Sequence, residues 1–121
     1  MNYASTTTIH SKAVPGVQLV VRRMSLGRRI ELAKAVRDLS LQMDFHAADE
    51  RVEGKLESAV ISAEVDRLYL SWGLVSVAGL QIDGEPATAL TLVDRGPESL
   101  TREAIEAIKA ECGLSEEQRK N

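Results

Sequence analysis

A segment from about residue 51 to residue 72 places apolar side chains on two opposite sides of one predicted helix. At about 100° per residue, one face holds Val52, Leu56, Ala59, Val60, Ala63 and Leu70. The roughly opposite face holds Ile61, Val65, Leu68 and Trp72, with Tyr69 at its edge. A helix on the surface of a domain needs only one apolar face, so two faces predict burial on both sides. The fold must therefore supply this helix with neighbours on two sides.

Two interpretations of this helix stay open. In the first, it is the central helix of a small domain, and both faces belong to the core. In the second, one face packs in the core and the other binds a partner or another copy of the chain. Tyr69 and Trp72 are half of the four aromatic residues, and aromatic side chains are enriched in interface hot spots. In the second interpretation, the residues that bind the partner are Ile61, Val65, Leu68, Tyr69 and Trp72.

Two more long or amphipathic helices are predicted, one before and one after this segment. Ser25 can cap the first, because its hydroxyl can accept a hydrogen bond from an unpaired backbone N–H, and this helix should run to about Ala48. Its apolar stripe consists of Leu32, Val36, Leu39 and Met43. The other helix begins at Ser99 or Thr101 and is stopped by Gly113. Its inward stripe consists of Ala104, Ile105, Ile108 and Cys112.

Short β-strands are predicted between these helices. Residues 17–22 and residues 75–82 are rich in β-branched side chains, a composition typical of strands. Gly79 suggests a bulge in the second strand, and Asp83-Gly84 is a strong signal for a tight turn. The fold class that follows is α+β and mostly α-helical, with two longer helices, a C-terminal helix and a short strand or hairpin element.

The ends of the chain and its domain organisation follow from the same signals. Thr88 can cap a short helix through about Val93, and Ser115–Gln118 matches a capping box at the start of a last short helix. Residues 1–14 are polar and show no hydrophobic periodicity, so we predict a flexible N-terminal arm. Residues 15–121 are predicted to form a single globular domain.

Reactive side chains are scarce, so we expect no enzyme, no cofactor and no metal. The single cysteine excludes an internal disulfide and a multi-thiolate metal site. It falls at a predicted helix C-terminus beside Glu111, where the helix dipole opposes a thiolate. The two histidines, His10 and His46, lie far apart. A metal role for the group Asp44, His46, Asp49 and Glu50 lacks a further histidine or cysteine at suitable spacing.

Charge and hydropathy narrow the setting of the protein. No stretch approaches the ~18 consecutive apolar residues of a membrane span, and one cysteine is typical of a reducing cytoplasm. Residues 1–37 contain seven Lys or Arg and one acidic residue, while the remainder is acidic and the whole chain carries a net charge of −3. The basic block Arg22–Arg37 could contact phosphates. The aromatic residues are not interleaved with it, so nucleic-acid binding is the lesser alternative.

Three segments, taken together, resemble tail assembly chaperone-like proteins of tailed bacteriophages and prophages. They are Glu64–Leu74 (EVDRLYLSWGL), Leu80–Thr88 (LQIDGEPAT) and the ending Leu114–Asn121 (LSEEQRKN). Gly96–Leu100, followed by an amphipathic helix, fits the same order of motifs. The resemblance covers about residues 17 to 121 and includes no catalytic signature.

This resemblance implies a small, mostly helical protein of the host bacterial cytoplasm that has no enzymatic activity. Such a protein binds the tape measure protein, and in some cases the tail tube protein, during tail assembly, and self-association is also expected. The family commonly has a longer product made by programmed frameshifting, for which the codons of Lys120-Asn121 could form part of a slippery site. The alternatives are a small structural component of the virion, such as a neck or tail-completion protein, and a nucleic-acid-binding protein.

Overall fold

The computed structural model describes the backbone of residues 1–47 and 52–113, and the side chains of residues 1–42 and 54–113. The chain divides into two compact units. The first, which we call the sheet unit, combines Met1–Met24 with Tyr69–Asn121, and the second, the hairpin unit, is Ser25–Leu68. The chain leaves the first unit after Met24 and returns to it at Tyr69. The single globular domain that the sequence indicates over residues 15–121 stays a prediction.

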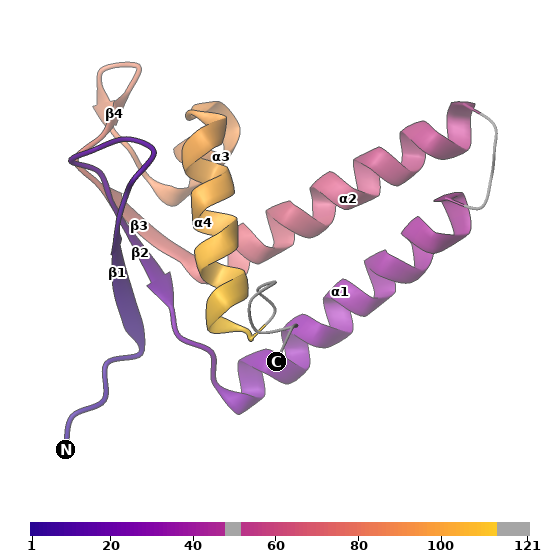
Figure 1. Cartoon of the computed structure of the whole chain (residues 1–121), viewed down its shortest axis with the longest axis horizontal. Helices are drawn as coiled ribbons and strands as arrows, with labels where there is room; N and C mark the ends of the chain where they lie inside the picture. Colours follow the sequence, from indigo (N-terminus) through magenta and orange to yellow (C-terminus); the bar gives the residue numbers. More distant parts are fainter. Residues whose placement is uncertain (48–51, 114–121) are drawn as a thin grey trace. The chain divides into compact units, whose positions relative to one another are not determined.

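The sheet unit contains a three-stranded antiparallel sheet with the order β1-β2-β3 (Figure 1). The strands are β1 (Thr6–His10), β2 (Gln18–Arg22) and β3 (Leu74–Ala78). The prediction of a flexible arm over residues 1–14 is therefore wrong for Thr6–His10, which pairs with β2 along its whole length. Threonine is a good strand former, and an edge strand with one solvated face needs few apolar side chains.

Helix α4 (Glu98–Glu111) covers one face of this sheet and forms the core of the unit with it (Figure 1). From the central strand, Leu19 and Val21 are fully buried, and alternate residues of β2 are exposed or half-buried. The predicted inward stripe of α4 is confirmed, because the side chains of Ala104, Ile105, Ile108 and Cys112 are all buried. Leu100, one turn before this stripe, is also completely buried.

The pairing of β2 with β3 is irregular at one position. Val20 pairs with Ser76 and Val21 pairs with Leu74, so Val75 has no partner in the register. The bulge predicted at Gly79 lies elsewhere in the structure, because β3 has already ended at Ala78. Gly79 has a φ of +80° and separates β3 from the next strand, a backbone conformation that glycine adopts at little cost.

A small hairpin and a short helix complete the sheet unit. The strands β4 (Gln81–Ile82) and β5 (Glu85–Pro86) pair across the predicted Asp83-Gly84 turn. Both turn residues have positive φ values, 54° and 82°, as a type I′ hairpin turn requires. Helix α3 (Ala89–Arg95) follows and contacts β3, β4 and α4.

The hairpin unit consists of two helices that each begin close to the predicted residue. Helix α1 (Leu26–Ala47) starts after Ser25, whose hydroxyl accepts the Arg28 backbone N–H at 3.2 Å as predicted. Helix α2 (Val52–Gly73) has 22 residues, and its last five belong to the sheet unit. The mostly helical α+β class predicted from the sequence is confirmed. Among the described residues, no helix is long and apolar enough to span a bilayer.

Candidate partner-binding surface

The five predicted partner-binding residues lie on one side of α2, and two of them are buried. The side chains of Ile61 and Tyr69 are only 3% and 5% exposed. Val65, Leu68 and Trp72 are half-buried. Little of Ile61 and Tyr69 is therefore left for a partner to contact, whereas Val65, Leu68 and Trp72 keep some accessible surface. Their role in binding stays a prediction.

Tyr69 lies in the part of α2 that packs into the sheet unit. The Lys109 ammonium group lies 5.4 Å from the centre of the Tyr69 ring, a cation–π distance. Four residues later, Gly73 is buried so close to α4 that a Cβ atom there would lie 2.6 Å from a side-chain carbon of Ile108. The C-terminal turn of α2 is thus fixed against α4, and Tyr69 serves the core of this unit.

The first helix of the hairpin unit also has a less exposed side and a more exposed side. Leu32 is buried and Val36 and Leu39 are half-buried, as their predicted stripe requires, and the side chain of Met43 lies outside the described residues. On α2, the less exposed side is that of Ile61, Val65 and Leu68. We call these two sets the inner rows of α1 and α2.

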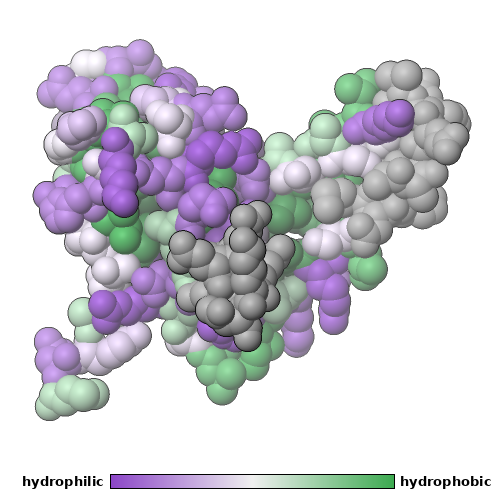
Figure 2. Space-filling view, in the orientation of Figure 1, coloured by the Kyte–Doolittle hydropathy of each residue, from purple (hydrophilic) through white to green (hydrophobic). Residues whose placement is uncertain are grey.

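The opposite side of each helix exposes apolar residues to solvent. We call these the outer rows: on α1 the row is Leu26, Ile30, Ala33 and Leu41, and on α2 it is Leu56, Ala59, Val60 and Ala63. The three large residues of the α1 row are between 48% and 76% exposed, and Leu56 and Val60 are 63% and 51% exposed. Green hydrophobic atoms are visible along both helices in Figure 2. Single exposed leucines are normal in soluble proteins, but rows at helical spacing form patches that partners bind.

The sequence predicts both apolar faces of α2. It places the partner on the face of Ile61, Val65 and Leu68, which is the less exposed of the two in the structure. Both faces are apolar, so periodicity gave no means of deciding which one lies inward. The aromatic residues Tyr69 and Trp72 decided the choice, although a buried aromatic contributes equally to a core. The outer row of α1 was missed because only the stripe through Leu32 was followed; Leu26, Ile30 and Leu41 at helical spacing were the available signal.

The basic block Arg22–Arg37 is divided between the two units. Arg22 and Arg23 belong to the sheet unit, where Arg23 lies 5.8 Å from the centre of the Tyr3 ring and donates to the Ala4 carbonyl at 3.4 Å. The other basic residues of the block are on α1, where Arg37 forms an exposed ion pair with Asp38 at 3.5 Å. Exposed pairs of this kind contribute little to stability.

Ser11 and Glu103 form a polar contact that joins distant parts of the sheet unit. The Ser11 hydroxyl donates to Glu103 Oε1 at 2.5 Å, and the backbone N–H of Lys12 donates to Oε2 at 2.8 Å. The Ala13 N–H also points to Oε2, at 3.4 Å, and the Val14 N–H donates to the Ser11 oxygen at 2.9 Å. These bonds join the β1–β2 connection to α4, and we call this set of contacts the clasp. The Ser11 hydroxyl therefore has a structural role.

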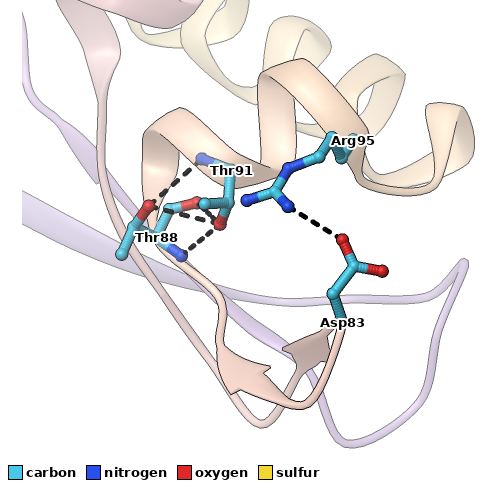
Figure 3. A network of polar contacts seen from close by, with 4 residues as sticks. All are labelled: Asp83, Thr88, Thr91 and Arg95. Carbon is cyan, nitrogen blue, oxygen red and sulfur yellow. Dashed lines mark hydrogen bonds and ion pairs between the residues drawn. The ribbon is translucent and has the colours of Figure 1, made fainter.

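A second polar network fixes the β4–β5 turn beside α3 (Figure 3). The Thr91 N–H donates to Thr88 Oγ1 at 3.1 Å, and the Thr88 N–H donates to Thr91 Oγ1 at 2.8 Å. This reciprocal pair is a capping box, and it bears out the predicted cap. Arg95 at the end of α3 donates to Asp83 of the turn at 2.9 Å. All four residues hold local structure.

Other candidate residues for chemistry are dispersed over the part of the chain that the structure describes. His10 is exposed at the end of β1, and Cys112 is buried at the C-terminus of α4. Within the same residues, no cluster of three or more histidines, cysteines or carboxylates is placed to hold a metal ion. Three predicted features lie outside the described residues: the side chains of Asp44, His46, Asp49 and Glu50, the capping box Ser115–Gln118 and the pair Lys120-Asn121.

Comparison of the whole chain with protein-family models, curated proteins and solved structures gave no match in any of the three.

Proposed function

We propose that this protein is a tail assembly chaperone that binds apolar helical segments of a phage tape measure protein while the tail is built. The observation that carries the proposal is that Val65, Leu68 and Trp72, on one side of α2, keep part of their apolar surface accessible in the folded chain. Ile61 and Tyr69 on the same side are buried within the chain, and an amphipathic client helix would lie against the surface that stays accessible beside them. The motif order described above supplies the family.

The half-buried side chains on this side of α2 are the proposed client contacts. Val65, Leu68 and Trp72 retain part of their surface, and a bound helix would remove it from water. These partly buried side chains can lose only a small apolar area to each turn of a client helix. At about 25 cal/mol per Å², one copy would therefore bind one turn of the client weakly. Many copies along a long client would then be needed to cover it.

The first experiment is to sequence the gene and the DNA that follows it. The proposal expects an overlapping −1 reading frame near the codons of Lys120-Asn121 and, further on, a long gene of coiled-coil character. Segments of that gene product should be insoluble when expressed alone and soluble when co-expressed with this chain. A plain stop codon and a downstream product whose solubility does not respond to the chain would contradict the proposal.

A second experiment separates a chaperone from a structural virion component. Mass spectrometry of purified phage particles should detect the tail tube protein and not this chain, because a chaperone is released as the tail closes. Recovery of the chain from mature particles in amounts comparable to tail proteins would instead establish the structural alternative.

A variant tests the proposed contact residues directly. Trp72→Ala should reduce the co-solubilised client severalfold while circular dichroism shows the helical content of the wild type. Val75→Ala changes a more exposed apolar residue of β3, outside α2, and serves as the matched control that should leave client binding unchanged. A Trp72→Ala protein that folds and binds the client as well as wild type would remove Trp72 from the site.

A further inference from the structure

Strand β1 forms one edge of the three-stranded sheet (Figure 1), and no other described strand pairs with its outer side. Just before β1, the Ser5 carbonyl accepts the Arg23 N–H at 2.8 Å. Just after β1, the Ser11 N–H donates to the Val17 carbonyl, also at 2.8 Å. The bonded groups of Ser5 and Ser11 therefore face the strand β2 and its continuation.

The alternation of an antiparallel ladder then assigns the direction of every backbone group between these two serines. Thr7 and Ile9 have the same phase as the serines, so their N–H and C=O groups face β2. The remaining residues of β1 have the opposite phase, and their N–H and C=O groups point to the outer side: Thr6, Thr8 and His10. A further strand could pair with these groups.

The features that usually keep an edge strand from pairing with another chain are bulges, prolines and lysines. Within β1 there is no proline or lysine, and all five residues pair with β2 without a shift in register. The strand at the opposite edge, β3, differs from β1 in this respect. Val75 is left out of its register, and α3 contacts it. Of the two edges, β1 is therefore the better template for an added strand.

The core of the sheet unit is incompletely covered at this edge. Ile9 pairs with Leu19 and lies on the same face of the sheet, the face that packs in the core. Leu19 is completely buried, whereas Ile9 and Thr7 on the same face of β1 are only half-buried. An apolar side chain on a strand beside β1 would remove the remaining surface of these two residues from water.

The other face of the sheet has a basic residue near the same edge. Neither Asp nor Glu occurs in β1, β2 or β3, and the exposed Arg22 pairs with Thr6. A strand added beside β1 would lie about 10 Å from β2, a distance that an arginine and a glutamate side chain span together. Lys12 offers less attraction, because the Glu103 carboxylate beside it offsets its charge. The complement of Arg22 is an acidic side chain.

From these observations we propose that the outer edge of β1 binds an extended segment of another protein, which alternates apolar with acidic residues and adds a fourth strand to the sheet. The backbone of this segment pairs with Thr6, Thr8 and His10. Its apolar side chains cover Ile9, and its acidic side chains lie on the face of Arg22. The inference does not rest on the proposed client, because it concerns a different unit and an extended segment in place of a helix.

Amide exchange with solvent, measured by NMR on the full-length chain, tests the edge residue by residue. The probe is a peptide of about seven residues with blocked ends, in which valine alternates with glutamate. In the free protein, the amides of Thr7 and Ile9 should exchange slowly, because they are bonded to β2. The amides of Thr6, Thr8 and His10 should exchange fast. Adding the peptide at about 1 mM should slow this second set about threefold or more.

Two changes separate backbone pairing from other modes of binding. Thr8→Pro removes an N–H that faces outward, and the bonds between β1 and β2 do not use this group. It should abolish the effect of the peptide on Thr6 and His10, whereas the matched control Thr8→Ala keeps the N–H and should bind like the wild type. A peptide methylated on all its backbone nitrogens cannot donate hydrogen bonds and should not slow exchange in the unaltered protein. This second test holds even if Thr8→Pro disturbs β1.

The charge preference is tested with two further variants and a second peptide. Arg22→Gln should weaken binding of the glutamate peptide about twofold to fivefold. Lys34→Gln, which removes an exposed cation of α1 outside the sheet unit, should not change it. A peptide with lysine in place of glutamate should bind more weakly to the wild type. Equal binding of the two peptides would overturn the preference for an acidic segment.

Three results would overturn the site itself. The first is a glutamate peptide that leaves the exchange of Thr6, Thr8 and His10 unchanged at about 1 mM. The second is a methylated peptide that slows their exchange as well as the unmethylated one does. The third is slow exchange of the same amides in the free protein that becomes slower as the protein concentration rises, because a second copy would then occupy the edge.

Discussion

The carboxylate of Glu103 on α4 anchors the β1–β2 connection, and its removal should weaken the sheet unit. Its oxygens accept the Ser11 hydroxyl at 2.5 Å and the Lys12 N–H at 2.8 Å, with a longer contact of 3.4 Å to the Ala13 N–H. A hydrogen bond to a charged group contributes about 1.5 to 3 kcal/mol when it is buried. Glu103 is half-exposed, so solvent screening lowers the value of the whole clasp to about 1 to 2 kcal/mol.

The same contacts determine how the clasp depends on pH. Burial raises the pKa of the Glu103 carboxyl, but the hydrogen bonds from Ser11, Lys12 and Ala13 and the charge of Lys12 lower it by more, so the net pKa lies below its ordinary value of 4.5. The unfolded chain therefore binds a proton at a higher pH than the folded chain does. The stabilisation is complete above the unfolded pKa and is lost as the pH falls through the folded pKa.

Urea unfolding of Glu103→Gln measures both the free energy that the clasp contributes and its dependence on pH. Trp72 belongs to the sheet unit and is the single tryptophan, so its fluorescence reports on the unit that contains the clasp. Near pH 7 the free energy of unfolding should fall by about 1 to 2 kcal/mol with little change in the slope against urea. Below about pH 4.5 the difference between wild type and variant should shrink, because the wild-type carboxylate becomes protonated.

Glu106→Gln is the matched control, because Glu106 is an exposed glutamate of the same helix. It should change the free energy of unfolding by less than about 0.5 kcal/mol. The reasoning fails if Glu103→Gln is as stable as wild type at neutral pH. It also fails if the variant is less stable by a constant amount from neutral pH down to the acid unfolding of the protein, because ionisation of Glu103 would then have no part in the effect.

Three further substitutions in the sheet unit have expected outcomes that thermal or urea unfolding would check. Gly73→Ala should destabilise by about 1 to 3 kcal/mol, because the new methyl group would overlap Ile108; an unchanged midpoint would show that this side chain moves aside freely. Thr88→Ala removes the cap of α3 and should cost about 1 kcal/mol, with a value near zero contradicting the capping box as a stabilising contact. Leu100→Ala should cost about 2 to 5 kcal/mol, since the side chain is fully buried, whereas Leu90→Ala, which is exposed, should cost less than about 0.5 kcal/mol; equal effects would place the core elsewhere.

The elements that could be predicted from the sequence are those fixed by chemistry within a few residues. Ser25 and Thr88 accept hydrogen bonds from the first turns of α1 and α3, and Asp83-Gly84 adopts positive φ values in its turn. The inward stripe of α4 follows in the same way from the spacing of its apolar residues. In each case the partner of the group lies nearby in the chain, so the local sequence contains the whole interaction.

The features that could not be predicted depend on residues far apart in the chain. Strand β1 exists because β2 offers it a backbone edge, and a run of threonines alone does not show that a partner is present. The clasp joins Ser11 to Glu103 across 92 residues. Val75 is left out of the register because of the way β2 pairs with β3. The division into two units arises from the return of the chain to the first unit at Tyr69.

The exposed apolar residues of the hairpin unit contribute less to the stability of the fold than the buried ones, because folding removes little of their surface from water. Leu56 and Val60 retain more than half of their surface in the folded chain, so a polar residue at either position would remove little buried area. Helix propensity would not suffer either, since glutamate and lysine form helices at least as well as valine. Polar substitutions at Leu56 and Val60 should accordingly leave the free energy of unfolding almost unaltered, whereas substitutions at Glu103 and Gly73 should lower it.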